Sequence, residues 1–137
     1  MRKLTSIEIC AGAGGQALGL DRAGFDHLAC VEFDADAVQT LRANRPDWEI
    51  FHGDVREWSY GGKRAVDLLA GGVPCPPFSV AGKGLGHDDE RDLFPEVIRL
   101  AREIQPRAIM IENVKGLLST RFSNYREALL GQVRRQG

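Results

Sequence analysis

The chain has 137 residues, which is enough for one domain with a hydrophobic core and too few for two ordinary domains. Its hydrophobic fraction of 43% and charged fraction of 27% are typical of a globular protein and exclude an intrinsically disordered one. The formal net charge is -1, so any contact with nucleic acid has to be local, because the chain lacks the basic excess of a self-sufficient nucleic-acid binder.

The sequence indicates a cytoplasmic protein without a membrane span or a metal site. No apolar run approaches the roughly 20 residues of a membrane helix, and the first eight residues lack the apolar stretch of a secretory signal. The spacing of Cys10, Cys30 and Cys75 fits neither a disulfide framework nor a CxxC metal site. We therefore expect reduced thiols, with Cys10 and Cys30 inert and buried on strands.

Short apolar runs alternate with helical patterns along the chain. The expected elements are, in order, a strand at 7–10, a helix at 14–23, a strand at 28–32, a helix at 35–44, strands at 49–51 and 66–70, a helix at 92–105, a strand at 108–111 and a helix at 125–135. This alternation predicts an α/β fold with a doubly wound, mostly parallel sheet. Residues 80–89 contain three glycines and are expected to form a mobile loop.

A glycine-rich turn follows the first expected strand and opens the first expected helix. Residues 12–17 (GAGGQA) match the pattern G-x-G-x-x-[GA], and Glu32 follows about 20 residues after Gly12, where a carboxylate can bind both hydroxyls of a ribose. Asp54 comes after the third expected strand and could accept a hydrogen bond from an adenine amino group. The pattern favours an adenosine-type cofactor over a plain turn with solvated acids, and it leaves a nicotinamide dinucleotide and S-adenosylmethionine both open.

Cys75 stands in a setting that is unsuited to the interior of a strand. Pro74, Pro76 and Pro77 fix the backbone around it, so the thiol is held at low entropic cost. A nucleophilic thiol needs such placement, together with nearby groups that stabilise the thiolate. Cys75 is therefore the candidate nucleophile of the chain.

Six short motifs occur in one order and cover nearly the whole chain. They are residues 9–15 (ICAGAGG), Glu32, residues 53–55 (GDV), residues 74–79 (PCPPFS), residues 91–94 (RDLF) and residues 112–114 (ENV). Together they resemble the first six motifs, I to VI, of the DNA (cytosine-5) methyltransferases. The resemblance implies a Rossmann-like fold that binds S-adenosylmethionine.

The resemblance also implies a reaction. Cys75 would attack carbon 6 of a cytosine flipped out of double-stranded DNA, since the ring is unreachable inside the stacked duplex. Glu112 would hold the ring nitrogen and the amino group and stabilise the protonated ring. Carbon 5 would take the methyl group of S-adenosylmethionine, leaving S-adenosylhomocysteine, and loss of the carbon 5 proton would release Cys75.

The resemblance assigns further residues to binding. Those expected around the cofactor are Ala11, Gly12, Ala13 and Gly15 on the methionine and ribose side, Glu32 on the ribose, Phe33 on the adenine face, Asp54 and Val55 at the adenine edge, and Pro74 and Leu93 on the far side. Those expected to contact DNA are Ser79, Lys83 and Arg91. Two positions depart from the family pattern, which usually has Phe at Cys10 and Gln at Pro76, so one aromatic contact with the cofactor would be lost.

A family member would continue beyond residue 137 with two more strands and a target-recognition domain. We therefore expect residues 1–137 to be a partial catalytic domain of a split or truncated enzyme, inactive alone and needing a complementary chain. Strand 108–111 would then be an open apolar edge. The alternatives are an inactive module that binds the cofactor or a partner, and a nicotinamide-dependent oxidoreductase, which gives Cys75 no role. By the same resemblance, we expect the residues that read the DNA target sequence to lie outside residues 1–137.

Overall fold

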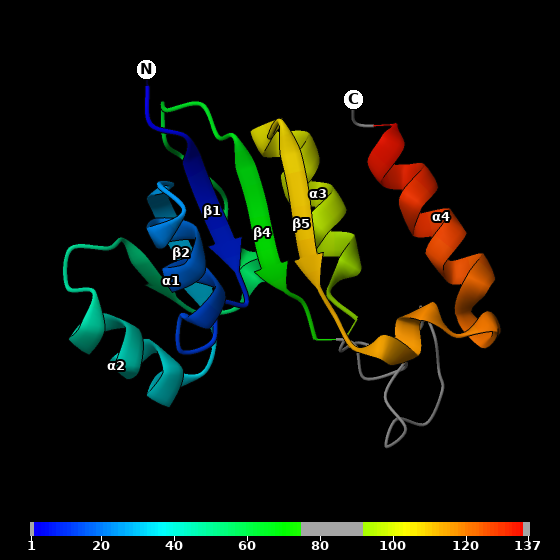
Figure 1. Ribbon diagram of the computed structural model, residues 1–137, viewed down its shortest axis with the longest axis horizontal. Coiled ribbons are helices and arrows are strands. Elements are labelled where there is room, and N and C mark those ends of the chain that lie inside the picture. Colours follow the sequence, from blue (N-terminus) through cyan, green and yellow to red (C-terminus); the bar gives the residue numbers. More distant parts are fainter. Residues whose placement is uncertain (1, 75–91, 136–137) are drawn as a thin grey trace.

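The computed structural model describes residues 2–74 and 92–135 (Figure 1). Its five strands form one parallel sheet in the order β3-β2-β1-β4-β5, with β1 (Thr5–Ile9), β2 (Asp26–Glu32), β3 (Ile50–His52), β4 (Leu68–Gly72) and β5 (Ala108–Glu112). The helices are α1 (Gly15–Arg22), α2 (Ala35–Asn44), α3 (Phe94–Ile104) and α4 (Ser123–Arg134), and short 3-10 helices are η1 (Val55–Glu57), η4 (Lys115–Leu118) and η5 (Thr120–Phe122). The expected α/β fold with a parallel, doubly wound sheet is confirmed.

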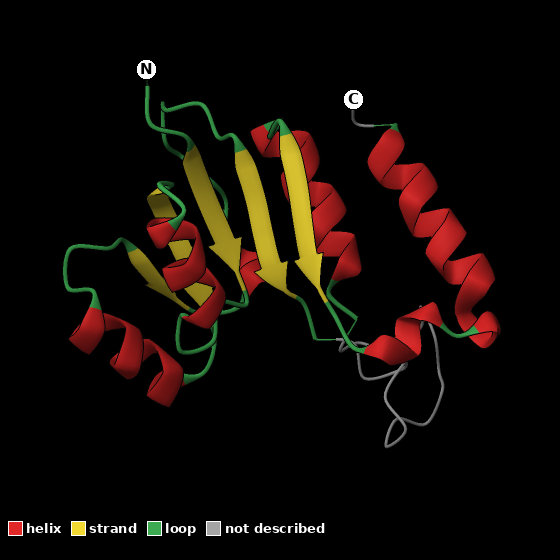
Figure 2. Cartoon of the chain, in the orientation of Figure 1, coloured by secondary structure: helices red, strands yellow, loops and turns green. Residues whose placement is uncertain are grey.

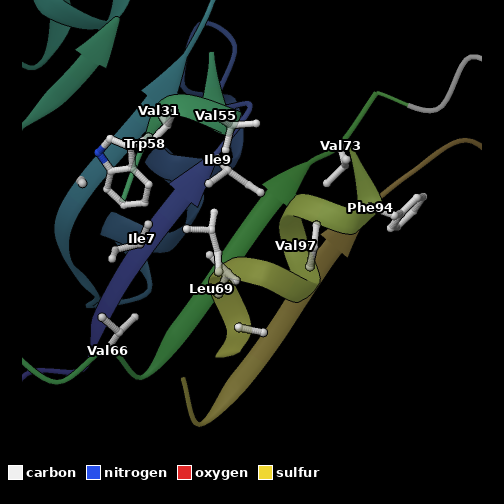
Figure 3. Close-up of a cluster of buried hydrophobic side chains, with 13 residues drawn as sticks. Ile7, Ile9, Val31, Val55, Trp58, Val66, Leu69, Val73, Phe94 and Val97 are labelled. Carbon is white, nitrogen blue, oxygen red and sulfur yellow. The ribbon is translucent and has the colours of Figure 1, made fainter. Parts of the chain in front are cut away.

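Helices cover both faces of the sheet (Figure 2). The alternation of side chains along β1 sends Ile7 and Ile9 into the core shared with α3, whereas Ser6 and Glu8 point to the face that carries α1. The larger core cluster joins Leu69 of β4 to Val97 and other apolar residues of α3, and it extends to Val55 and Trp58 (Figure 3). Buried apolar contacts of this kind supply most of the driving force for folding.

Several element bounds differ from the expected ones for physical reasons. The fourth strand spans Leu68–Gly72 rather than residues 66–70, and the Asp67 backbone just before it already bonds to Thr5 and Ala108. α3 begins at Phe94 rather than residue 92, and α4 begins two residues earlier than expected, at Ser123. α2 has the expected bounds, since Asp34 caps its first turn by accepting a hydrogen bond from Ala37.

β5 forms one edge of the sheet within the described residues, as expected from the sequence. It pairs with β4 on one side, and Met110 at its centre is 38% exposed. Within residues 2–74 and 92–135, no helix is both long and apolar enough to span a membrane.

Candidate active site

The carboxyl ends of the five parallel strands meet at one edge of the sheet. The chain runs outward from β1 through β2 to β3 and then returns to place β4 on the other side of β1. In open α/β sheets, ligands bind outside the carboxyl ends of the strands, where the strand order reverses in this way. The segments that follow β1 and β4 are therefore the natural place for a site.

A pocket of about 550 Å³ lies at this edge, within the usual size range of small-molecule sites. Its lining residues come from the ends of β1 and β2, the turn after β3, η1, the segment after β4 and the start of α3; they are Cys10, Val31, Glu32, Phe33, Gly53, Asp54, Val55, Arg56, Pro74 and Leu93. Six of the ten residues expected around a cofactor belong to this lining, namely Glu32, Phe33, Asp54, Val55, Pro74 and Leu93.

The Glu32 carboxylate is fixed by three backbone N–H groups. Gly12 donates to Oε2 at 2.6 Å, while Phe33 and Asp34 donate to Oε1 at 2.8 and 2.7 Å. Each carboxylate oxygen has two lone pairs, so Oε1 is fully used by Phe33 and Asp34, and Oε2 can still accept one hydrogen bond from a ligand hydroxyl. The bond from Gly12 also joins the glycine turn to the end of β2.

Asp54 follows the strand next to Glu32, since the preceding Gly53 donates its N–H to the Glu32 carbonyl at 2.9 Å, and its carboxylate is also fixed. Its side chain caps η1 by accepting from the Arg56 backbone N–H at 2.9 Å, and it forms an ion pair with the Arg56 guanidinium at 3.0 Å. Phe33, which is 74% exposed, is an aromatic surface in the same lining. The pocket thus combines two acceptor groups with apolar walls, an arrangement that suits a nucleoside.

Cys10 lies just beyond β1 and not on it, which corrects one expectation. Its backbone has φ +50, a left-handed conformation that non-glycine residues rarely adopt, and its side chain lines the pocket. Burial, with the charges of Glu32 and Asp54, raises the pKa of the Cys10 thiol to about 12. The thiol therefore stays protonated at neutral pH, although Cys10 is half-buried rather than buried as expected. Burial likewise raises the pKa of Cys30, within β2, to about 12.

The glycine turn connects β1 to α1 outside the pocket lining. Gly14 has φ +93, and a Cβ there would come within 2.5 Å of a Leu41 side-chain carbon, so this position requires glycine. Ala11 is buried, and Ala13 contributes to a separate pocket of about 360 Å³ between α1 and α2. Ala11, Gly12 and Ala13 thus lie in the turn and Gly15 begins α1; the bond from Gly12 to Glu32 joins this turn to the pocket.

Glu112 ends β5 beside the end of β4. The strand register pairs it with Gly72, and its side chain is exposed at the carboxyl edge. The neighbouring Asn113 donates its side-chain N–H to the Val73 carbonyl at 2.8 Å, and its own Oδ1 accepts from Val114 at 2.8 Å. The segment around Glu112 is therefore bound directly to the segment that leads to residue 75.

The remaining predicted residues, Cys75, Ser79, Lys83 and Arg91, lie outside the described residues, as do Pro76 and the loop 80–89. Four pocket residues were absent from the predicted set: Cys10, Val31, Gly53 and Arg56. Gly53 and Arg56 flank the predicted pair at 54 and 55, so neighbourhood in sequence was the available signal. Among the described residues, no group of three His, Cys, Asp or Glu side chains could hold a metal ion.

Comparison with known proteins identifies the family. The family model for C-5 cytosine-specific DNA methylases matches residues 4–137. The chain belongs to the C-5 cytosine-specific DNA methylase family. A type II methyltransferase of Neisseria gonorrhoeae, M.NgoMIV, is 63% identical over 98% of this chain, and M.NaeI of Lentzea aerocolonigenes is 51% identical over all of it.

Two solved structures share the fold of this chain. A prophage-encoded protein of E. coli, described as a DNA modification methyltransferase, has a TM-score of 0.81 and 31% identity over 96% of the chain. DNMT2 of Spodoptera frugiperda shares the fold, with a TM-score of 0.73. The chain spans 43% of the length of M.NgoMIV and 34% of M.NaeI, so it corresponds to part of these methyltransferases.

Proposed function

We propose that the chain carries the cofactor pocket and the reactive thiol of a DNA (cytosine-5) methyltransferase. The observation that carries this proposal is the pocket at the carboxyl edge of the sheet, where Glu32 and Asp54 present fixed carboxylates around an apolar lining. We infer that it binds S-adenosylmethionine. When bound, this cofactor supplies an electrophilic methyl group.

The donor and acceptor chemistry of the lining fits an adenosine with a cationic tail. Ribose hydroxyls and the adenine amino group are hydrogen-bond donors, and Glu32 and Asp54 are acceptors. The charged groups of the lining are these two carboxylates and Arg56, whose guanidinium pairs with Asp54. A positively charged sulfonium is favoured near these carboxylates. An acid that binds ribose is common to nicotinamide dinucleotide sites as well, so the methyltransferase is favoured over the oxidoreductase by Cys75, to which the oxidoreductase gives no role.

The catalytic roles follow the family motif. Cys75 attacks carbon 6 of an extruded cytosine, forming a bond between sulfur and carbon. Glu112 holds the ring nitrogen and the amino group, and its place beside Gly72 supports this role because the segment after β4 leads to residue 75. Carbon 5 gains the methyl group and loses its proton, and the bond to Cys75 then breaks. Ser79, Lys83 and Arg91 contact DNA in this proposal.

The proposal includes double-stranded DNA as substrate and a complementary chain as partner. The relatives that the chain matches are two to three times longer, which supports further protein contributing to the full reaction. A module that binds cofactor without catalysis is the alternative. It predicts cofactor binding with no methyl transfer when any complementary methyltransferase fragment is supplied.

Calorimetric titration of the 137-residue chain with S-adenosylmethionine tests the proposal. We expect one site per chain and no heat with a nicotinamide dinucleotide. Asp54→Ser should weaken binding about tenfold, because serine still caps η1 but cannot supply the carboxylate. Asp47→Ser, at an exposed acid outside this pocket, is the matched control and should bind like the unmodified chain. Binding of the nicotinamide dinucleotide alone would refute the proposal.

A further inference from the structure

Arg99 of α3 makes an unusually complete set of hydrogen bonds. One terminal nitrogen, Nη2, donates to the carbonyls of Val55 at 3.0 Å and Trp58 at 2.9 Å. The other two nitrogens donate to carboxylates of the same helix, Nε to Glu96 at 2.6 Å and Nη1 to Glu103 at 3.1 Å. The spacing of these acids, at i−3 and i+4, keeps both on the side of α3 that carries Arg99.

These bonds hold the segment 55–60 against α3. Glu103 adds a second anchor, because its other oxygen accepts from the Tyr60 backbone N–H at 2.6 Å. Val55 and Trp58 are 4% and 8% exposed, and their side chains enter the same core as Val97 of α3 (Figure 3). The Val55 carbonyl also accepts from the Trp58 backbone N–H at 3.2 Å, so the Trp58 carbonyl would lose most without Arg99, and a buried carbonyl is costly to leave without a partner.

The segment that Arg99 holds forms one wall of the cofactor pocket. Val55 and Arg56 line the pocket, and the preceding Asp54 is fixed to the same short helix through its cap. The lining also includes Leu93, which precedes the first residue of α3. α3 therefore positions two parts of the lining, with Leu93 at its amino end and Arg99 about two turns further along.

We propose that Arg99 is a positioning residue that sets the adenine side of the pocket, although it does not line the pocket itself. This inference rests on the proposed function of that pocket. A guanidinium is required because its fork directs donors to two carbonyls and two carboxylates at once. A lysine at this position keeps the positive charge, but it can donate to only some of these two carbonyls and two carboxylates.

The test compares the affinities of four chains for S-adenosylhomocysteine by calorimetry. Arg99→Met should raise the Kd about tenfold, and Arg99→Lys should raise it by a smaller factor. Arg102→Met is the matched control, since Arg102 lies exposed on the same helix outside this pocket. It should leave the Kd unchanged. An unchanged Kd in both Arg99 variants, with binding by the unmodified chain intact, overturns the inference alone.

A second ligand separates positioning from a general loss of stability. In S-inosylhomocysteine an oxygen replaces the adenine amino group, so the preference for S-adenosylhomocysteine reports the contact with Asp54. We expect this preference to fall in Arg99→Lys, whereas simple destabilisation would weaken both ligands equally. An unchanged preference overturns the inference.

Amide hydrogen exchange tests the inference without any ligand. Exchange at residues 55–60 should rise about tenfold in Arg99→Lys, with little change in β1 and β4. If the unmodified chain binds no S-adenosylhomocysteine, the proposed function fails, and exchange at this segment still decides whether Arg99 fixes it. Unchanged exchange at these residues would overturn the role of Arg99 in that case too.

Discussion

Glu8 is a buried carboxyl in the middle of the central strand. It is 1% exposed, its register partners are Cys30 on β2 and Ala70 on β4, and its Oε2 has no hydrogen-bond partner among the described residues. Burial raises the pKa of Glu8 to about 7, because the charged form is poorly solvated there. Glu8 therefore destabilises the folded state at any pH where its carboxyl is ionised in the unfolded chain.

Stability should therefore fall as the pH rises toward 7. Below the unfolded pKa of about 4.3, Glu8 is protonated in both states and costs nothing. Between that value and about 7 the unfolded chain releases the proton more readily, so Glu8 lowers the free energy of unfolding by roughly 3 kcal/mol by pH 8. Urea unfolding of the unmodified chain and Glu8→Gln at pH 5 and pH 8 measures this difference.

The free energy of unfolding of Glu8→Gln should lack this pH dependence. At pH 8 it should exceed that of the unmodified chain. Glu127→Gln changes an exposed acid of α4 and serves as the control, with the original pH dependence retained. A constant difference between the unmodified chain and Glu8→Gln over this range would contradict the assignment.

Two adjacent glycines of β4 differ in how closely they approach β1. A Cβ at Gly71 would lie 2.8 Å from the Ile9 carbonyl oxygen, which the strand pairing prevents from moving. A Cβ at Gly72 would meet nothing closer than 3.5 Å. We expect Gly71→Ala to lower the free energy of unfolding by about 1–3 kcal/mol, and Gly72→Ala to leave it nearly unchanged. Denaturant unfolding of both variants measures these changes. Equal losses in the free energy of unfolding would refute the argument that Gly71 approaches β1 too closely for a Cβ.

At the scale of elements, Asp92 connects the start of α3 to α4. Its carboxylate accepts from the Phe94 backbone N–H at 3.0 Å and from the Tyr125 hydroxyl at 2.5 Å. The Phe94 and Tyr125 rings also meet edge to face, with centroids 6.0 Å apart. This contact holds α4 beside α3, on the face of the sheet that carries the main core.

Removing the Tyr125 hydroxyl should weaken this connection. Tyr125→Phe keeps the ring contact and takes a donor from the buried Asp92, so we expect a loss of about 1–2 kcal/mol in the free energy of unfolding. Tyr60→Phe is the matched control, since its hydroxyl donates to the Arg64 carbonyl at an exposed position. It should cost under about 0.5 kcal/mol. Similar losses in the two variants, measured in urea, would argue against a special role for Asp92.

The elements that the sequence predicted well are those with local signals. Asp34 before α2 and Pro46 after it mark both ends of that helix. The apolar pattern places β4 two residues early, because the two glycines that complete the strand, Gly71 and Gly72, carry no strand signal of their own. Glu32 and Asp54 are predictable in the pocket because Glu32 is the last residue of β2 and Asp54 comes shortly after the end of β3. The role of Arg99 is not predictable from the sequence, since its contacts with Val55 and Trp58 arise only when α3 packs against η1.

At the scale of the whole molecule, the carboxyl and amino ends of the parallel strands carry different groups of polar residues. The carboxyl edge holds the proposed pocket, and the amino edge holds a charged cluster around Asp67. Arg2 donates both terminal nitrogens to this carboxylate at 2.6 and 2.7 Å, Thr5 donates its backbone N–H at 2.9 Å, and Arg107 approaches at 3.4 Å. Asp67 thus joins three distant parts of the chain where β1, β4 and β5 begin.

The Asp67 cluster should make the fold sensitive to acid. The Arg2 hydrogen bonds, together with the Thr5 N–H, hold the pKa of Asp67 well below its usual range. Its stabilising contribution is therefore complete above the unfolded pKa of about 3.9 and is lost as the pH falls below it. At pH 6, Asp67→Asn should unfold at a lower denaturant concentration than the unmodified chain. This gap between the two unfolding midpoints should narrow as the pH falls toward 3. Asp47→Asn, at an exposed acid, should show no such gap. A gap that stays constant from pH 6 to pH 3 would mean that the Asp67 side chain stabilises the amino edge through packing or neutral hydrogen bonds rather than through its charge.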